Sequence, residues 1–291
     1  PFFLASYHIG MTSFNGKTIV FSDMHCGLSG NKVSRLNICA KAVEEMTSFA
    51  EREGVENMIF GGDWFHSRSM LDNNTINVSL RLVSALAERC RLALIVGNHD
   101  AYLKNSTDIN SINIFRDTPN VTVIDRPEEV LVNGQRFLLV PWLSDMSKYS
   151  PESFDAMVGH FEISSKYLIQ SYIEEHSAAK ASAADSAKVS AVLGKPKSAD
   201  LIGNFVDLVR KGGTVYAGHI HTRKEFSVRD RDFVFIGSPY QQNLGDIGSD
   251  RGFYVLDESN ARKFVKIAAP EHVQVFMSEA LKPGYDFSKC A

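Results

Sequence analysis

The chain has 291 residues, of which 44% are hydrophobic and 22% are charged, and its formal net charge is −3. This length and composition suit one large α/β domain, or two smaller ones, with a real core. The charge excludes a globally basic nucleic-acid-binding protein, so contacts with phosphates would need a local patch or bound metal. No apolar run approaches the roughly 18 residues that a membrane span requires, and no membrane association is expected.

The ends of the chain and its cysteines carry few functional signals. Residues 1–10 lack the basic segment of a signal peptide, and we interpret them as an extension or tag before a domain at 11–270 and a short tail at 271–291. The four scattered cysteines favour reduced thiols in a cytoplasm-like compartment. Ser177–Lys197 is rich in Ala, Ser and Lys, which is typical of a solvated helix or mobile excursion, with a functional lid as the alternative.

The first part of the chain alternates β-branched runs with amphipathic segments, an order that implies parallel strands joined by helical crossovers. From about Val121 strands become frequent, which predicts a mixed sheet, and NGQ at 133–135 is typical of a hairpin turn. The expected helices are Val33–Glu53, Asn74–Arg89 and Asp108–Phe115. The expected strands are Lys17–Ser22, Asn57–Phe60, Leu92–Val96, Val121–Ile124, Glu129–Val132, Phe137–Val140, Ala156–Gly159, Thr214–Ala217, Phe226–Val228, Phe233–Ile236, Phe253–Leu256 and Lys263–Ile267.

Six of the nine histidines lie just past the carboxyl end of an expected strand. That edge of an open α/β sheet is where ligands bind. The histidines occur in five short segments, which read SDMH, GGDWFH, GNHD, VGH and GHIH in chain order. The six residues are His25, His66, His99, His160, His219 and His221.

The side chains around these histidines are typical metal ligands. Asp23 and His25 are two residues apart, so on an extended backbone both side chains would leave the same side, and GHIH repeats that spacing. Asp63 follows two glycines that permit a tight turn, and Asn98 offers an amide oxygen. Carboxylates, an amide and imidazoles suit a pair of divalent ions such as Mn²⁺ or Fe²⁺ rather than a thiolate zinc site.

The five segments, in this order and over residues 17–256, resemble the calcineurin-like metallophosphoesterase superfamily. The resemblance implies an α/β fold in which a two-layered mixed β-sheet sandwich is flanked by helices. It also implies a dinuclear centre with Asp63 as the bridging carboxylate and with two divalent ions, Mn²⁺ being favoured over Mg²⁺ or Fe²⁺. The implied ligands are Asp23, His25 and His221 for the first metal and Asn98, His160 and His219 for the second.

The resemblance also implies catalytic roles beside the metals. His99 is expected to protonate the leaving group or to stabilise developing charge. Asp100 is expected to orient His99 by accepting from its ring N–H, with capping of a turn as the alternative.

The stretch GGDWFHSR, together with GNHD, narrows the resemblance to nuclease subunits of double-strand-break repair complexes, the SbcD type. Serine/threonine phosphatases of the superfamily carry GDxVDRG and GNHE instead. The SbcD resemblance implies a DNA exonuclease or endonuclease that acts in DNA repair, recombination or degradation. It implies a homodimer with an SbcC-type ATPase partner, and it implies that His66 positions the DNA backbone or the scissile phosphate.

The segment after GHIH, IGSPYQQNLGDIGSDRGFYVL at 236–256, also resembles that family. About 35 residues follow Leu256, so a cap domain is expected to be absent or reduced. The helices expected at Asn74–Arg89 and Asp108–Phe115 match the family's dimerisation region, although their apolar stripes could equally pack on the sheet. Seven cations could steer DNA: Arg68, Lys104, Lys148, Lys166, Arg223, Lys224 and Arg251.

Two other functions remain open at this point. A small-molecule or cyclic-nucleotide metallophosphodiesterase would use the same metal ligands, and the net charge of −3 suits it. A non-catalytic scaffold that keeps the fold would not need every ligand position to be intact, as it is here. A comparison of the rate of DNA cleavage with the rate of small-ester hydrolysis distinguishes the nuclease from the small-molecule phosphodiesterase.

Overall fold

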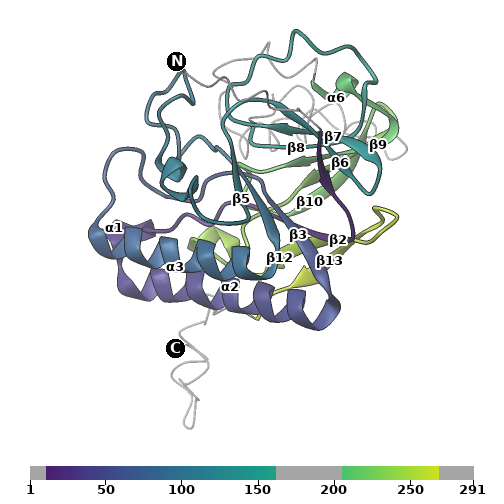
Figure 1. Cartoon of the computed structure of the whole chain (residues 1–291). Coiled ribbons are helices and arrows are strands. Elements are labelled where there is room, and N and C mark those ends of the chain that lie inside the picture. Colours follow the sequence, from purple (N-terminus) through teal and green to yellow (C-terminus); the bar gives the residue numbers. More distant parts are fainter. Residues whose placement is uncertain (1–10, 162–204, 269–291) are drawn as a thin grey trace, which may run out of the picture.

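The computed structural model describes residues 11–161 and 205–268, which form two mixed β-sheets packed face to face (Figure 1). The expected two-layered mixed sandwich flanked by helices is therefore confirmed. The predictions for residues 1–10, Ser177–Lys197 and 271–291 lie outside the described residues. No helix in the described ranges is both long and apolar enough to cross a membrane.

The six-stranded sheet carries the parallel βαβ part of the chain. Strands β2 to β5 are parallel to one another, and β12 pairs with β2 in the antiparallel direction. In spatial order the strands are β13 (Arg262–Lys266), β12 (Gly252–Leu256), β2 (Lys17–Phe21), β3 (Val55–Phe60), β4 (Arg91–Ile95) and β5 (Val121–Ile124).

The seven-stranded sheet has a parallel centre and antiparallel hairpins near its edges. Strands β7, β8, β9 and β11 are parallel, whereas β6–β7 and β10–β11 are antiparallel. In spatial order the strands are β1 (Thr12–Phe14), β6 (Glu128–Val132), β7 (Gln135–Val140), β8 (Phe154–Gly159), β9 (Val209–Ala217), β11 (Arg231–Phe235) and β10 (Lys224–Val228).

The helices cover the outer face of the six-stranded sheet. In Figure 1, α2 (Val33–Glu53) and α3 (Asn73–Arg89) lie side by side along one flank of the molecule. Met46 of α2 and Leu86 of α3 are fully buried in one cluster with Phe21 and Phe60 of the sheet. The shorter helices are α1 (Leu28–Asn31), η1 (Ser111–Phe115), α6 (Phe205–Leu208) and η2 (Leu244–Asp246).

A second core fills the space between the sheets. Val20 and Ile59 of the six-stranded sheet pack there against Leu139, Val158 and Tyr216 of the seven-stranded sheet. Because successive side chains of a strand point to opposite faces, adjacent residues of β2 serve the helix-side and the inter-sheet cores. This burial on both faces explains why the parallel strands are continuous apolar runs in the sequence.

All twelve expected strands overlap strands of the structure, and the helices expected at Val33–Glu53 and Asn74–Arg89 form. Two local predictions add one further success and one error. The hairpin at 133–135 is confirmed: Val132 pairs with Gln135, and Asn133 and Gly134 have φ angles of 49° and 78°. The helix expected at Asp108–Phe115 is wrong, since only the 3₁₀ turn η1 forms. The reason is that residues 109–110 pair with the preceding loop, where Tyr102 N–H donates to the Ile109 carbonyl at 2.9 Å.

Candidate metal centre

The expected site residues follow the carboxyl ends of five strands, and both sheets contribute. Six of them come from the six-stranded sheet, after β2, β3 and β4, and a seventh, Asp100, lies in the loop after β4. The other three follow β8 and β9 of the seven-stranded sheet. By strand they are Asp23 and His25 (β2), Asp63 and His66 (β3), Asn98, His99 and Asp100 (β4), His160 (β8), and His219 and His221 (β9).

The loops that follow β2 and β3 continue to run side by side after the strands end. Asp23 N–H donates to the Gly62 carbonyl at 2.9 Å, and His25 N–H donates to the Asp63 carbonyl at 3.0 Å. The backbone is not extended, contrary to the expectation for Asp23 and His25: their φ angles are 57° and 45°, and Asp63 has 64°. Left-handed backbone costs on the order of 1–3 kcal/mol per residue and persists where the surroundings enforce it.

Two glycines permit the close approach of the loops. Gly62 has a φ angle of 101°, and a Cβ there would lie 2.5 Å from Nδ1 of His160. A Cβ on Gly97 would lie 2.2 Å from the backbone nitrogen of Asp63. Both glycines are therefore required for Asp63 to come close to the residues that follow the neighbouring strands.

Asp100 is fully buried and holds the loops together by their backbones. The expected hydrogen bond from the His99 ring to Asp100 is wrong, because His99 Nδ1 instead lies 2.5 Å from the His66 carbonyl. Burial raises the pKa of the Asp100 carboxyl to about 6, and the charge of Asp63 adds to that increase. The Asp100 carboxylate accepts four backbone N–H groups: Gly97 at 3.0 Å, Asp63 at 2.9 Å, Trp64 at 3.3 Å and Phe65 at 3.0 Å.

One cluster of candidate ligands, here named the Asp23 group, consists of Asp23, His25 and His221. Nε2 of His25 lies 3.0 Å from Nε2 of His221. The two ring nitrogens lie 3.8 Å and 3.7 Å from the Asp23 carboxylate. Asp23 and His25 are buried and His221 is partly exposed, so the group opens to solvent on the side of the seven-stranded sheet.

The second cluster, the Asn98 group, consists of Asn98, His160 and His219. The amide oxygen of Asn98 lies 2.8 Å from Nε2 of His160 and 2.8 Å from Nδ1 of His219. Asp63 lies between the two groups. Its Oδ2 is 3.3 Å from Nε2 of His160 and 3.5 Å from Nε2 of His25.

The spacing and chemistry of these atoms fit a pair of divalent ions. An ion that binds its ligands at about 2.1 Å holds neighbouring ligand atoms about 3.0 Å apart in an octahedral shell. In each group a shared atom lies 2.8–3.8 Å from the other two donor atoms, and all of the donors are nitrogen or oxygen. Imidazole, carboxylate and amide donors favour borderline to hard ions.

The charges of the site are set by burial and by Asp63. Burial lowers the pKa of His25 well below its usual range and lowers that of His219 to about 3, so both rings are neutral, as metal ligands must be. Burial also opposes a charge on His160, but the ion pair with Asp63 outweighs it and raises the pKa to about 9. The same pair holds the pKa of Asp63 below its usual value, although burial acts to raise it.

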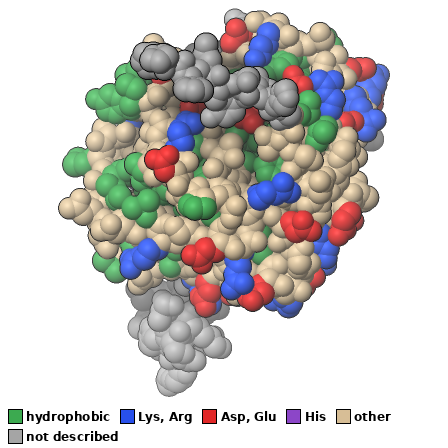
Figure 2. Space-filling view, viewed as in Figure 1, with side chains coloured by type: hydrophobic (Ala, Val, Ile, Leu, Met, Phe, Trp, Pro, Cys, Tyr) green, Lys and Arg blue, Asp and Glu red, His purple; other side chains and the backbone are tan. Residues whose placement is uncertain are grey.

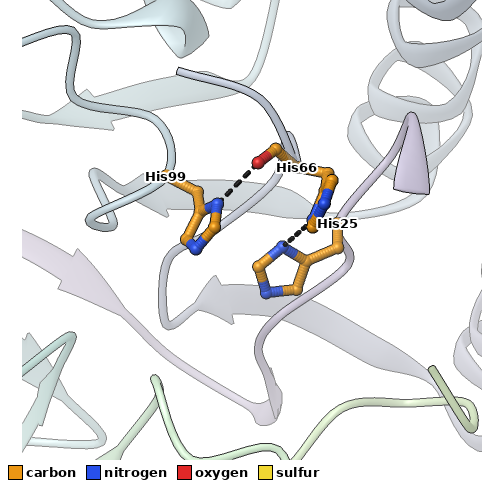
Figure 3. A group of neighbouring side chains, drawn as sticks. All are labelled: His25, His66 and His99. Atoms are coloured by element: carbon orange, nitrogen blue, oxygen red, sulfur yellow. Dashed lines mark hydrogen bonds between the residues drawn. The ribbon is translucent and has the colours of Figure 1, made fainter. Parts of the chain in front are cut away.

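Three histidines lie close together, His25 of the Asp23 group and its neighbours His66 and His99 (Figure 3). The rings of His66 and His99 are stacked, with centroids 5.4 Å apart and planes 20° apart. Nδ1 of His66 faces Nδ1 of His25 at 3.4 Å. Because a carbonyl only accepts, His99 Nδ1 carries the proton in its contact with the His66 carbonyl, and Nε2 is the ring nitrogen left for other partners.

The structure adds residues that the sequence reasoning missed. The Trp142 ring packs 5.2 Å from the ring of His219 and 6.0 Å from that of His160. Gln242 donates from its side chain to the Asp23 carbonyl at 2.7 Å. Trp142 follows β7 just as the histidines follow their strands, so the rule that located the histidines could have found it.

The cations expected to steer DNA differ in their availability. Arg251 is 2% exposed and ion-paired with Asp246 at 2.7 Å, so it cannot contact DNA from this position. Arg223 is paired with Glu225 at 3.2 Å. Lys104, Lys148 and Lys224 are exposed and Arg68 is half-buried, whereas Lys166 lies outside the described residues.

A sandwich of two mixed sheets with buried Asp, Asn and His clusters at the strand ends defines a metallophosphoesterase. The profile of the calcineurin-like phosphoesterase family matches residues 16–223, and the chain belongs to this family. The family uses a dinuclear metal centre, and the described Asp and His groups could bind metal.

Two viral proteins are similar in sequence. The chain is 25% identical over 256 residues to exonuclease subunit 1 of Enterobacteria phage T4, which covers 84% of this chain and 66% of that protein. It is 28% identical over 115 residues to putative phosphoesterase 078R of Invertebrate iridescent virus 3, covering 38% of this chain and 33% of that protein. The chain thus spans just under two thirds of the phage protein and a third of the iridovirus protein.

A solved structure, described as a novel archaeal phosphodiesterase, has a TM-score of 0.42 and 13% sequence identity. The alignment covers 86% of this chain and 99% of that chain.

Proposed function

We propose that this protein is a dinuclear-metal-dependent deoxyribonuclease that hydrolyses DNA phosphodiesters by exonucleolytic or endonucleolytic cleavage. The observation that carries the proposal is the similarity to a phage exonuclease subunit over 84% of the chain. The stacked His66–His99 pair beside the ligand groups supports it, because GGDWFHSR is the segment that narrows the family resemblance to nucleases. Roles in DNA repair, recombination or degradation follow from the same resemblance.

In this proposal the Asp23 group holds one ion, the Asn98 group holds the other, and Asp63 bridges them. The contacts of Asp63 Oδ2 with one histidine of each group support the bridging role. Mn²⁺ is the favoured ion, since the donors are imidazoles and oxygens without thiolate, and Mg²⁺ or Fe²⁺ are alternatives. Bound ions would lower the pKa of an attacking water and polarise the phosphoryl oxygens.

The side chains outside the ligand groups handle the proton and the substrate. Nε2 of His99 delivers a proton to the leaving oxygen, while its Nδ1–H stays bonded to the His66 carbonyl. The His66 ring is half-buried, stacks on His99 and positions the DNA backbone. Asp100 supports both by fixing the loops after β3 and β4 rather than by contacting the His99 ring.

Local cations supply the attraction for DNA that the net charge does not. Nη1 of Arg68, two residues after His66, is buried and has no hydrogen-bond partner within residues 11–161 and 205–268. A guanidinium N–H in that situation suits a phosphate oxygen. Exposed Lys104 and Lys148 come from the loops after β4 and β7, which belong to different sheets.

Assembly is the least constrained part of the proposal. The phage relative is named a subunit, which supports assembly with another protein, and the family resemblance makes an SbcC-type ATPase the proposed partner. A homodimer is supported by hydrophobic side chains gathered on the flank that carries the loop after β4 (Figure 2). In that loop and in η1, Tyr102, Leu103, Ile109 and Ile114 are 40–57% exposed.

The test compares substrates with purified protein and Mn²⁺: linear DNA, bis-p-nitrophenyl phosphate and cyclic AMP. We expect cleavage of DNA that EDTA abolishes and that added Mn²⁺ restores. Good turnover of a small ester without any cleavage of DNA would refute the nuclease and favour a small-molecule phosphodiesterase. The lack of any metal-dependent hydrolysis would favour a non-catalytic scaffold.

A pair of variants makes the DNA test specific. His66→Gln should reduce cleavage of DNA more than hydrolysis of bis-p-nitrophenyl phosphate, because only DNA has a long backbone to position. Met70→Ala is the matched control, since Met70 lies in the same loop and is 73% exposed. Equal losses on both substrates for His66→Gln would contradict the role of His66.

A further inference from the structure

The segment between β11 and β12, residues 236–251, lies against the backbone of the Asp23 group. Besides Arg251, three of its residues donate hydrogen bonds to backbone carbonyls of the loops that carry this group. The contacts are Ser238 N to His221 O at 3.0 Å, Tyr240 Oη to Met24 O at 2.5 Å, and Gln242 Nε2 to Asp23 O at 2.7 Å.

A buried ion pair organises this segment. Arg251 and Asp246 are 2% and 5% exposed, and Arg251 Nη2 lies 2.7 Å from Asp246 Oδ1. Nη1 of Arg251 donates to the His221 carbonyl and, at 2.7 Å, to Ser238 Oγ. Oδ2 of Asp246 accepts from the backbone N–H of Gln242 at 2.8 Å. One ion pair thus connects directly to His221 and, through Gln242, to Asp23.

A buried ion pair is weak evidence for stability, because desolvation of both charges offsets their attraction. Arg251 is nevertheless satisfied on several sides, since its Nε and Nη2 also donate to Ser249 Oγ at 3.1 Å and 2.8 Å. Only the planar fork of a guanidinium can reach a carboxylate, a carbonyl and two hydroxyls at once. These contacts therefore require an arginine at position 251, and they hold the backbone next to the Asp23 group in place.

Asp23 needs such support because its backbone is strained. Its φ angle is 57°, a conformation that side-chain-bearing residues rarely adopt unless the surroundings enforce it. Its N–H is held by the Gly62 carbonyl at 2.9 Å, and its own carbonyl is held by Gln242. The carbonyl of His221 is held by Ser238 N–H and by Arg251.

We propose that Arg251 and Gln242 are positioning residues for the metal held by the Asp23 group. They donate hydrogen bonds to the backbone carbonyls of His221 and Asp23 and so fix the orientation of the His221 and Asp23 side chains. The inference rests on the proposed ligand set. The Asn98 group has different support: Nδ1 of His160 donates to the Gly61 carbonyl at 2.8 Å, and Trp142 packs against His219. Loss of Arg251 or Gln242 therefore weakens one ion selectively.

The experiment titrates the full chain with Mn²⁺ alone and follows binding by calorimetry and by the electron paramagnetic resonance of free Mn²⁺. Wild type should bind two ions. Arg251→Ala should weaken one of them by about 10- to 100-fold and leave the other unchanged, as loss of an outer partner of a metal ligand does. Arg251→Lys should be intermediate, because it keeps a charge for Asp246 but loses the fork.

Gln242→Met provides a second route that leaves both charges in place. It removes the hydrogen bond to Asp23 with little change in volume, and it should weaken the same ion. Should Arg251→Ala fail to fold, the result for Gln242→Met decides. If Gln242→Met binds both ions with wild-type affinity, the proposal is overturned.

Arg231→Ala is the matched control, because Arg231 is also a buried arginine that donates to backbone carbonyls. It is 5% exposed and donates to the Val209 carbonyl at 2.5 Å and the Arg229 carbonyl at 2.7 Å. It should lose stability without a change in Mn²⁺ affinity, and an equal loss of one ion would overturn a specific role for Arg251.

The Mn²⁺ titration also separates this inference from the nuclease. A wild-type chain that binds two ions but does not cleave DNA refutes only the nuclease. A wild-type chain that does not bind two ions overturns the ligand set and this inference with it.

Discussion

The two ligand groups are built from similar side chains but are supported in different ways. The Asp23 group has left-handed backbone at Asp23 and His25. A buried ion pair in the segment 236–251 contacts it through the backbone carbonyl of His221. The Asn98 group is held by the Gly61 carbonyl, by the Trp142 ring and by the loops that Asp100 ties together. The contrast teaches that one candidate group has a charge-based support and the other a support from packing and backbone. Two ions bound as proposed should therefore respond to different substitutions.

The largest expected effect comes from Asp63, because its Oδ2 contacts a histidine of each group. Asp63→Asn should weaken both ions and lower hydrolysis of bis-p-nitrophenyl phosphate by about 10³-fold, which is the scale of losing a principal electrostatic stabiliser. Mn²⁺ stoichiometry and the rate are measured together. Two ions bound at full occupancy would refute the bridging role of Asp63.

Substitution of His99 should lower the rate of DNA cleavage nearly as much, but it should not change the affinity for metal. His99→Ala should lower the rate of DNA cleavage by about 10²- to 10⁴-fold, the usual contribution of a general acid. The loss should be smaller on bis-p-nitrophenyl phosphate, whose leaving group needs no proton, and Mn²⁺ binding should be unchanged. An unchanged rate on DNA would contradict the role of His99, and loss of an ion would assign it to the metal centre instead.

Substitution of Asp100 tests how much its hydrogen bonds to the loops after β3 and β4 stabilise the protein next to the Asn98 group. Asp100→Ala removes the acceptor of four buried N–H groups and should lower the free energy of unfolding by about 3–5 kcal/mol. Urea denaturation of the metal-free protein measures it, and Asp100→Asn, which keeps one carbonyl oxygen, should lose less. A loss below about 1 kcal/mol would show that water replaces the carboxylate.

The number of protons released when a metal ion binds should differ between the two groups near neutral pH. The ring of His160, with a pKa of about 9, carries a proton that an ion must displace, whereas His25 and His219 are already neutral. At pH 7.5 the ion in the Asn98 group should release about one proton, and its affinity should rise with pH until about pH 9. Calorimetry in buffers of different ionisation enthalpy counts the protons, and a release that does not change between pH 7.5 and 9.5 would contradict this.

The smallest effect is expected at Trp142. An aromatic contact contributes about 0.5–1.5 kcal/mol, so Trp142→Ala should weaken the ion of the Asn98 group by about 2- to 10-fold. The ion of the Asp23 group should not change. An equal effect on both ions would mean that the two supports are not independent.

The sequence was sufficient for the framework and the polar clusters. Parallel strands that are buried on both faces give continuous apolar runs, and polar residues just past such runs meet at one edge. For that reason the sequence alone predicts that Asp23, Asp63 and His160 lie near one edge, where the structure places them as candidate ligands. The hairpin at 133–135 was predictable because Asn-Gly chemistry is local.

What failed depends on contacts between segments far apart in the chain. The partner expected for Asp100 is wrong, because its four N–H donors come from two loops whose close approach depends on the tertiary fold. Arg251 is expected from the sequence to steer DNA, but it is buried. Its burial depends on contacts with Asp246 and with the chain around His221, which the sequence alone does not show. The left-handed backbone at Asp23 and His25 was missed because neither is a glycine.

The distribution of the ligands over both sheets has a consequence for synthesis of the chain. Each group combines residues numbered below 100 with a histidine at 160 or beyond, and Arg251 comes later still. A nascent chain that ends after β7 carries Asp23, His25, Asp63 and Asn98 but completes neither group. Both candidate groups can therefore be complete only when most of the polypeptide has been made, so the proposed hydrolysis would not begin while the chain is still short.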